Sequence, residues 1–131
     1  MRKIIILIPV FNDWDSLEKL LGEIDETVKN INNIFIECLI VNDDSTIISP
    51  QFLKPKNIKK VNILDMKKNR GHARCNAFGI RYVNKNEDFD NLILMDSDGE
   101  DNPQEISKML DLALRNNDSV ITSNRKRDTV S

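Results

Sequence analysis

Short apolar runs alternate along this chain with segments whose apolar residues recur at helical spacing. Five runs have the length and the β-branched content of strands: residues 4–8, 34–41, 61–64, 92–95 and 119–122. Three segments with helical spacing begin near Asp13, Gly71 and Pro103. Strands that alternate with helices form parallel sheets covered by those helices. The sequence therefore predicts an α/β fold, a Rossmann-like, mostly parallel sheet with helices on both faces.

Two details of packing follow from the same pattern. Residues 92–95 are apolar at every position, which favours burial on both faces of the sheet and a central place for this strand. In the segment that begins near Gly71, the helical spacing predicts that Ala73, Ala77 and Ile80 face the sheet.

Composition limits the class of protein. A chain of 131 residues with 40% hydrophobic and 31% charged residues is typical of one soluble globular domain. A net charge of −2 argues against a nucleic-acid partner, which would require a basic excess. The opening apolar run is too short for a membrane span and lacks a signal-peptide cleavage site. We expect a cytoplasmic protein in which Cys38 and Cys75 are free and buried.

Polar residues follow each expected strand at its carboxyl end. The segments at these positions contain Phe11, Asn12 and Asp13 after the first strand, Asn42 to Asp44 after the second, Asn69 to Gly71 after the third, Asp96 and Asp98 after the fourth, and Ser123 and Arg125 after the fifth. In open α/β sheets, ligands bind beyond the carboxyl ends of the strands, where the strand order reverses. The sequence therefore predicts one binding site along this end of the sheet.

The strongest chemical signal is the pair Asp96 and Asp98, which directly follows the apolar run and precedes Gly99. Hard divalent cations such as Mg²⁺ and Mn²⁺ take oxygen ligands, commonly one or two carboxylates together with phosphate oxygens. The pair therefore indicates a site for a metal-bound diphosphate. A solvated acidic turn is the alternative interpretation.

Four motifs, in order and covering nearly the whole chain, resemble those of family-2 glycosyltransferases with the GT-A fold. Residues 8–13 (Ile-Pro-Val-Phe-Asn-Asp) resemble the family's Pro-x-Tyr-Asn-Glu opening, and residues 41–46 resemble its Val-Asp-Asp-Gly-Ser-Thr segment. Residues 69–74 resemble its Asn-x-Gly-(Lys/His) helix start, and residues 96–103 its Asp-Ala-Asp-Gly-Glu-Asp-x-Pro segment. The nearest branch contains the dolichol-phosphate mannose synthase-like and polyprenyl-phosphate transferases.

The resemblance implies inverting transfer of a hexose from a nucleotide diphosphate sugar, a UDP- or GDP-sugar, with a divalent metal (Mg²⁺ or Mn²⁺). An acceptor such as a polyprenyl phosphate would lie at the cytoplasmic face of the membrane. It also implies the residues that bind the nucleotide sugar: Pro9, Phe11, Asp13, Asp43, Arg70, His72, Arg74, Asp96 and Arg125. The metal ligands would be Asp98 and Asp96, with Asp98 the more direct one.

Several of these residues also have a structural interpretation. Asp13 is a preferred type of helix N-cap, and Trp14 is placed to act as a hydrophobic staple for the following helix. Asn42 and Asp44 are typical turn formers that bond to their own backbone. His72 and Arg74 have the alternative of being solvated surface residues.

The sequence departs from the family pattern in three ways. Asn42 stands where an Asp is usual and Asp44 where a Gly is usual, which predicts rearranged recognition of the base. The Gln-x-x-Arg-Trp motif of processive polysaccharide synthases does not occur. The resemblance places the acceptor site and the catalytic base after the fifth strand. We therefore expect residues 1–131 to be a single nucleotide-sugar-binding GT-A domain, truncated at its C-terminal end.

Such a domain would bind a nucleotide sugar with negligible transfer by itself. Two other functions remain open at this point. One is a non-catalytic nucleotide-binding module. The other is a nucleotidyltransferase, which would need a Gly-rich, Lys-containing loop after the first strand, and residues 12–15 do not provide one.

Overall fold

The computed structural model of the chain describes residues 1–51, 55–97, 102–116 and 119–122. Within these ranges, five strands form one sheet in the order β3-β2-β1-β4-β5, and every pairing is parallel. The strands are β1 (Arg2–Val10), β2 (Ile34–Asn42), β3 (Lys60–Asp65), β4 (Asn91–Leu94) and β5 (Ser119–Thr122). The helices are α1 (Trp14–Val28), α2 (His72–Asn86) and α3 (Pro103–Arg115). The predicted α/β fold with a parallel sheet is confirmed.

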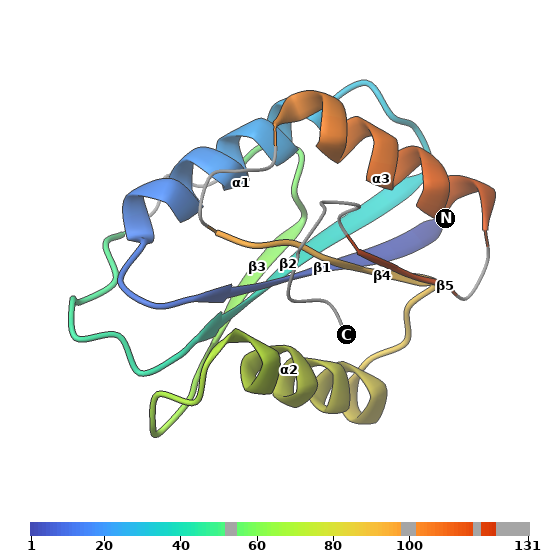
Figure 1. Cartoon of the computed structure of the whole chain (residues 1–131). Helices are drawn as coiled ribbons and strands as arrows, with labels where there is room; N and C mark the ends of the chain where they lie inside the picture. Colours follow the sequence, from blue (N-terminus) through green and yellow to red (C-terminus); the bar gives the residue numbers. More distant parts are fainter. Residues whose placement is uncertain (52–54, 98–101, 117–118, 123–131) are drawn as a thin grey trace, which may run out of the picture.

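The helices cover both faces of the sheet, as predicted. Helices α1 and α3 lie on one face and α2 lies on the other (Figure 1). Alternate residues of β1 point to opposite faces of the sheet. Ile4 and Ile6 pack with α1 and α3, whereas Ile5 and Leu7 pack with α2. Within the described ranges, no helix is long and apolar enough to cross a membrane.

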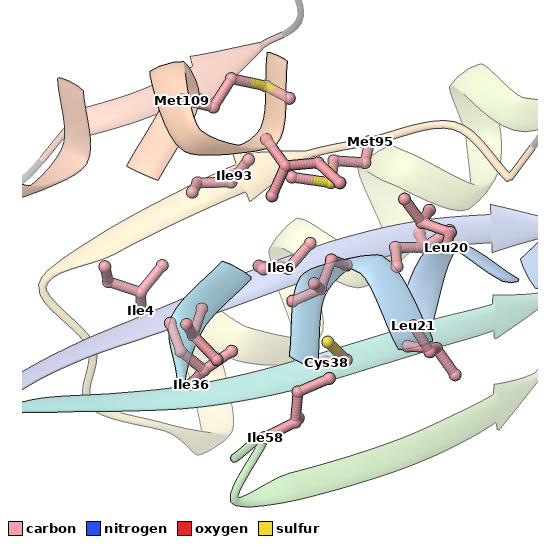
Figure 2. Close-up of a cluster of buried hydrophobic side chains, with 14 of the residues drawn as sticks. Ile4, Ile6, Leu20, Leu21, Ile36, Cys38, Ile58, Ile93, Met95 and Met109 are labelled. Atoms are coloured by element: carbon pink, nitrogen blue, oxygen red, sulfur yellow. The ribbon is translucent and has the colours of Figure 1, made fainter. Parts of the chain in front are cut away.

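The larger core layer lies between the sheet and helices α1 and α3. Figure 2 shows Leu20 and Leu21 of α1 and Met109 of α3 in one cluster with side chains of β1, β2 and β4. Cys38 of β2 is buried in this layer, where burial raises the pKa of its thiol. Cys38 and Cys75 are both buried and free, as expected from the sequence.

The centre of the sheet is β1 and not β4, which corrects the place predicted for residues 92–95. Strand β4 lies one position from the centre, between β1 and β5, so it is an interior strand. Leu92, Ile93 and Met95 are buried, whereas Leu94 is only partly buried. The apolar run of β1 is longer and is buried from Ile4 to Val10, and it therefore takes the most enclosed position.

The face of α2 that contacts the sheet also differs from the sequence prediction. The buried residues of this helix are Cys75, Gly79 and Val83. Ala73 and Ala77 are exposed, whereas Ile80 is partly buried and packs against the core layer under α2, so the prediction holds for Ile80 alone. The buried residues recur every four positions, and this stripe passes through Gly79, which has no apolar side chain to mark it in the sequence. The backbone of α2 approaches Leu7 of β1 closely at Gly79.

The Gly79→Ala variant tests this packing. A Cβ atom at this position would lie 2.5 Å from Cδ1 of Leu7 and 2.9 Å from Cδ2. Because Leu7 is fully buried, its side chain has little room to move. We expect a loss of about 1–2 kcal/mol in the free energy of unfolding, measured by urea denaturation.

Gly22→Ala in α1 is the matched control for Gly79→Ala. No atom of the described residues lies within 4 Å of a Cβ atom built at Gly22. Alanine has the higher helix propensity, so this variant should gain about 0.5–1 kcal/mol. Equal effects of the two substitutions would contradict the close contact between α2 and β1.

Candidate functional site

The order of the strands reverses between β1 and β4. From β1 the chain builds the sheet outward through β2 to β3, and it then returns to the other side of β1 with β4 and β5 (Figure 1). Ligands of open α/β sheets bind at the carboxyl ends of the strands beside such a reversal. The residues that follow β1, β2 and β4 at this end, 11–13, 43–45 and 95–97, are called the carboxyl rim below.

The structure brings most of the predicted site residues to this end of the sheet. Pro9 lies near the end of β1, and Phe11, Asp13, Asp43 and Asp96 lie on the carboxyl rim. Arg70, His72 and Arg74 lie at the start of α2, and all three are exposed. Asp98 and Arg125 are outside the described residues, so their predicted roles stay predictions.

Asp43 holds the start of α2 against the carboxyl rim. Its side chain is almost fully buried, with 1% of its surface exposed. Its Oδ1 accepts a hydrogen bond from the backbone N–H of Arg70 at 2.7 Å, and its Oδ2 accepts one from the N–H of Gly71 at 2.9 Å. The N–H of Asp43 itself donates to the carbonyl oxygen of Val10 at 2.8 Å. Asp43 therefore ties together the ends of β1 and β2 and the entry to α2.

The start of α2 has the features of an anion site. Gly71 precedes the helix with φ of 87°, a left-handed conformation that favours glycine. Within the described part of the chain, no side chain caps the first turn, which begins at His72. Uncapped N–H groups at a helix start attract anions such as phosphate. One turn further, burial and the Asp43 carboxylate raise the pKa of Cys75 to about 12, so this residue remains a thiol.

Asn12 joins the loop after β1 to the loop after β2. It has φ of 65°, and its side-chain Nδ2 donates to Oγ1 of Thr46 at 3.0 Å. Its Oδ1 accepts from the N–H of Ile47 at 2.9 Å, and its own N–H donates to Oγ of Ser45 at 2.9 Å. This junction was not predicted from the sequence. The pattern that would indicate it is an Asn shortly after one strand together with a Ser-Thr pair after the next strand.

Trp14 strengthens the same junction. Its ring is buried with the apolar residues of α1, but Trp14 is the first residue of the helix and follows the N-cap, so it does not form the predicted hydrophobic staple. Its Nε1–H donates to the carbonyl oxygen of Ile47 at 2.9 Å. The loops that follow β1 and β2 are therefore held together at the point where a ligand would contact both.

Asp13 occupies the N-cap position of α1, but its side chain makes no capping hydrogen bond. The carboxylate is exposed on the carboxyl rim. The capping interpretation therefore holds for the position of the residue and not for its carboxylate, which is accessible to a ligand.

The two departures from the family pattern after β2 are turn formers, as the sequence suggested. Oδ1 of Asn42 accepts a hydrogen bond from the N–H of Ser45 at 3.1 Å, and its Nδ2 donates to Asp65 at 2.9 Å. Asp44 has φ of 56°, in the left-handed region. Asp tolerates this conformation better than most residues with a side chain, which explains how it replaces the usual Gly.

At the end of β4, Asp96 is partly buried and Ser97 is fully buried. The N–H of Met95 donates to the carbonyl oxygen of Leu7 at 3.0 Å, which keeps this segment beside β1. Among the described residues, no group of three or more His, Cys, Asp and Glu side chains could hold a metal ion. Mg²⁺ usually takes only one or two carboxylates plus substrate phosphates, so the oxygen donor of Asp96 fits such a site.

A hollow of about 380 Å³ lies between the end of β3 and the start of α2. It is lined by Asp65, Met66, Lys67, Lys68, Arg70 and Phe78. Its volume is within the range of small-molecule sites. Cationic groups beside an apolar wall would suit an anionic ligand with a flat ring.

Comparison with known proteins agrees with the geometry. The sequence model described as glycosyl transferase family 2 matches residues 5–131. The undecaprenyl-phosphate 4-deoxy-4-formamido-L-arabinose transferase of Proteus mirabilis (strain HI4320) is 27% identical over 128 residues. This alignment covers 97% of the chain and 38% of the relative, so the chain spans well under half of the relative's length.

Proposed function

Since the chain belongs to glycosyl transferase family 2, we propose that it binds a nucleotide diphosphate sugar at the carboxyl rim, as the donor for transfer of a hexose to a lipid phosphate. One observation carries the proposal. The free carboxylate of Asp13, the uncapped start of α2 held by Asp43, and Asp96 all lie at the reversal of strand order. Acidic groups and an anion site at this one place suit a ligand that combines hydroxyl groups with phosphates.

The nucleoside would occupy the space beside the ends of β1 and β2. Pro9 and Phe11 would line it, and Asp13 would accept hydrogen bonds from the base or the ribose. The hollow lined by Arg70 and Phe78, between the end of β3 and α2, would supply a flat apolar surface and a cation. Each carboxylate oxygen of Asp43 already accepts a hydrogen bond from a backbone N–H group. A base or ribose contact would use the remaining lone pairs of this carboxylate.

The diphosphate would lie between the start of α2 and the end of β4. Arg70, His72 and Arg74 surround the uncapped helix start, and Arg125 would add a further cation. Asp96 and Asp98 would hold Mg²⁺ or Mn²⁺, which neutralises the leaving diphosphate when bound. The acceptor would need a base to remove its proton during inverting transfer, and no described residue is assigned that role.

The proposed acceptor class rests on the Proteus mirabilis relative, whose name specifies undecaprenyl phosphate. A polyprenyl phosphate would present a phosphate oxygen as the nucleophile at the membrane surface.

A thermal-shift panel tests the proposed donor site. The protein is heated with uridine, guanosine and adenosine diphosphates, or with the corresponding monophosphates, in Mn²⁺ or in EDTA. A ligand at one hundred times its dissociation constant adds about 2.7 kcal/mol of stability, which raises the melting temperature by several degrees. We expect this rise for at least one diphosphate in Mn²⁺ and a much smaller one in EDTA. No rise with any diphosphate would contradict the proposal.

A transfer assay separates the enzyme from a binding module. The protein is incubated with the nucleotide sugar of the best-binding base, Mn²⁺ and a short-chain polyprenyl phosphate, and the glycolipid is measured. Formation of the glycolipid supports the complete activity. Binding without transfer leaves the donor site supported and places acceptor activation outside residues 1–131.

A further inference from the structure

A buried ionisable cluster lies at the end of the sheet opposite the carboxyl rim, beneath the C-terminal end of α2. Glu37 of β2 is fully buried, and Glu87, which directly follows α2, is 10% exposed. The Nζ of Lys3, on β1, lies 3.3 Å from Oε1 of Glu87 and 3.7 Å from Oε1 of Glu37. Two carboxyl groups therefore share one close ammonium group in an enclosed place.

Each of the two carboxyl groups has one oxygen that accepts a hydrogen bond and one oxygen that does not. Oε2 of Glu37 accepts from Nδ2 of Asn62 at 3.3 Å, and Oε1 of Glu87 accepts from Nζ of Lys3. The other two oxygens, Oε1 of Glu37 and Oε2 of Glu87, are buried and have no hydrogen-bond partner among the described residues. Buried polar atoms in native proteins are almost always paired, so these two atoms need an explanation.

We propose that Glu37 and Glu87 share one proton, and that this acid pair fastens the C-terminal end of α2 to the amino end of the sheet. A single O–H···O bond between the two unpaired oxygens satisfies both of them. With one proton bound, the acid pair carries one negative charge, which Lys3 balances. With no proton bound, two negative charges would face one ammonium group in a buried site.

The groups around Glu37 favour its protonated form. Burial and the neighbouring Glu87 carboxyl raise the pKa of Glu37, in that order of importance. Two cations act in the opposite direction: Lys60, which lies opposite Glu37 on the neighbouring strand β3, and Lys3. They lower the pKa of Glu37 by less than burial and Glu87 raise it. The carboxylate of Asp90 accepts the backbone N–H of Lys3 at 2.8 Å, so a further negative charge lies on the β4 side of the cluster.

The acid pair predicts how stability depends on pH. The pKa of Glu37 is raised in the folded protein, so the folded state binds a proton that the unfolded state releases. The contribution of the pair is complete below the ordinary pKa of a glutamate and is lost as the pH rises through the raised value. This direction is opposite to that of a carboxylate stabilised in its charged form.

The Glu37→Gln variant tests the shared proton. Its amide N–H would donate permanently to Oε2 of Glu87, so the variant keeps the bond at every pH. We expect the melting temperature of Glu37→Gln, relative to the unmodified protein, to rise by about 4 °C or more between about pH 5 and about pH 8. The exposed Glu18→Gln of α1 is the control and should show no such trend.

Two further measurements keep the test decisive. Glu87→Gln, at the less buried position, should show the same trend and replaces Glu37→Gln if that variant does not fold. Infrared spectra of the unmodified protein at neutral pH should contain the C=O stretch of a protonated carboxyl, and either glutamine variant should lack it. A relative melting temperature that is constant across the pH range, or a missing carboxyl band, would overturn the proposal.

Discussion

The Asp43→Ala variant is expected to lose about 2–4 kcal/mol in the free energy of unfolding. The substitution removes the acceptor of the backbone N–H groups of Arg70 and Gly71, which lie 2.7 and 2.9 Å from the carboxylate oxygens. Hydrogen bonds to a charged group contribute about 1.5–3 kcal/mol each, and exposure of the two N–H groups to water recovers part of the loss. Urea denaturation followed by circular dichroism measures the change.

Asp44→Asn is the matched control for Asp43→Ala. Asp44 is exposed and has φ of 56°, a conformation that Asn tolerates well. Its substitution should change the free energy of unfolding by less than about 0.5 kcal/mol. If Asp43→Ala is as mild as Asp44→Asn, Asp43 does not hold the start of α2.

The Asp98→Asn variant is expected to abolish the Mn²⁺-dependent part of nucleoside diphosphate binding. A neutral amide is a poorer ligand for a hard cation than a carboxylate, and the family resemblance implies that Asp98 is the more direct ligand. Asp96→Asn should weaken the same effect less if Asp96 mainly contacts the ribose. Thermal shifts with the best-binding diphosphate, in Mn²⁺ and in EDTA, measure both effects.

Asp88→Asn controls for the loss of one negative charge. Asp88 is exposed and precedes β4, at the opposite end of this strand from Asp96. It should leave the Mn²⁺-dependent shift unchanged. An Asp98→Asn variant that keeps the full shift would remove the metal role assigned to the Asp-x-Asp motif.

The fold could be predicted from the sequence because the local signals agree with the global arrangement. The β-branched run of β1, the helical spacing of α1 and the proline that opens α3 each indicate one type of element. The predicted strands differ from the observed ones by at most two residues at either end. The carboxyl rim follows from the fold, because parallel strands bring their carboxyl ends to one edge.

The contacts that shape the site could not be predicted in this way. The bond from Asp43 to the start of α2 joins residues 27 and 28 positions apart, and no local pattern specifies it. The junction at Asn12 depends on a positive φ and on partners more than thirty residues away. The buried face of α2 includes Gly79, where the backbone approaches Leu7 closely, and a glycine gives no signal in an apolar pattern.

The proposed function places a metal-bound nucleoside diphosphate at the carboxyl rim. Paramagnetic broadening in ¹⁵N-labelled protein tests it most directly, because Mn²⁺ broadens only the amide signals near it. With Mn²⁺ and the best-binding diphosphate, we expect broadening at Asp13, Gly71 and Asp96, and sharp signals at Asn33 and Glu87 at the opposite end of the sheet. Mg²⁺ in place of Mn²⁺ should restore all signals. Broadening centred on Asn33 and Glu87, or none beyond that caused by Mn²⁺ alone, would contradict the claim.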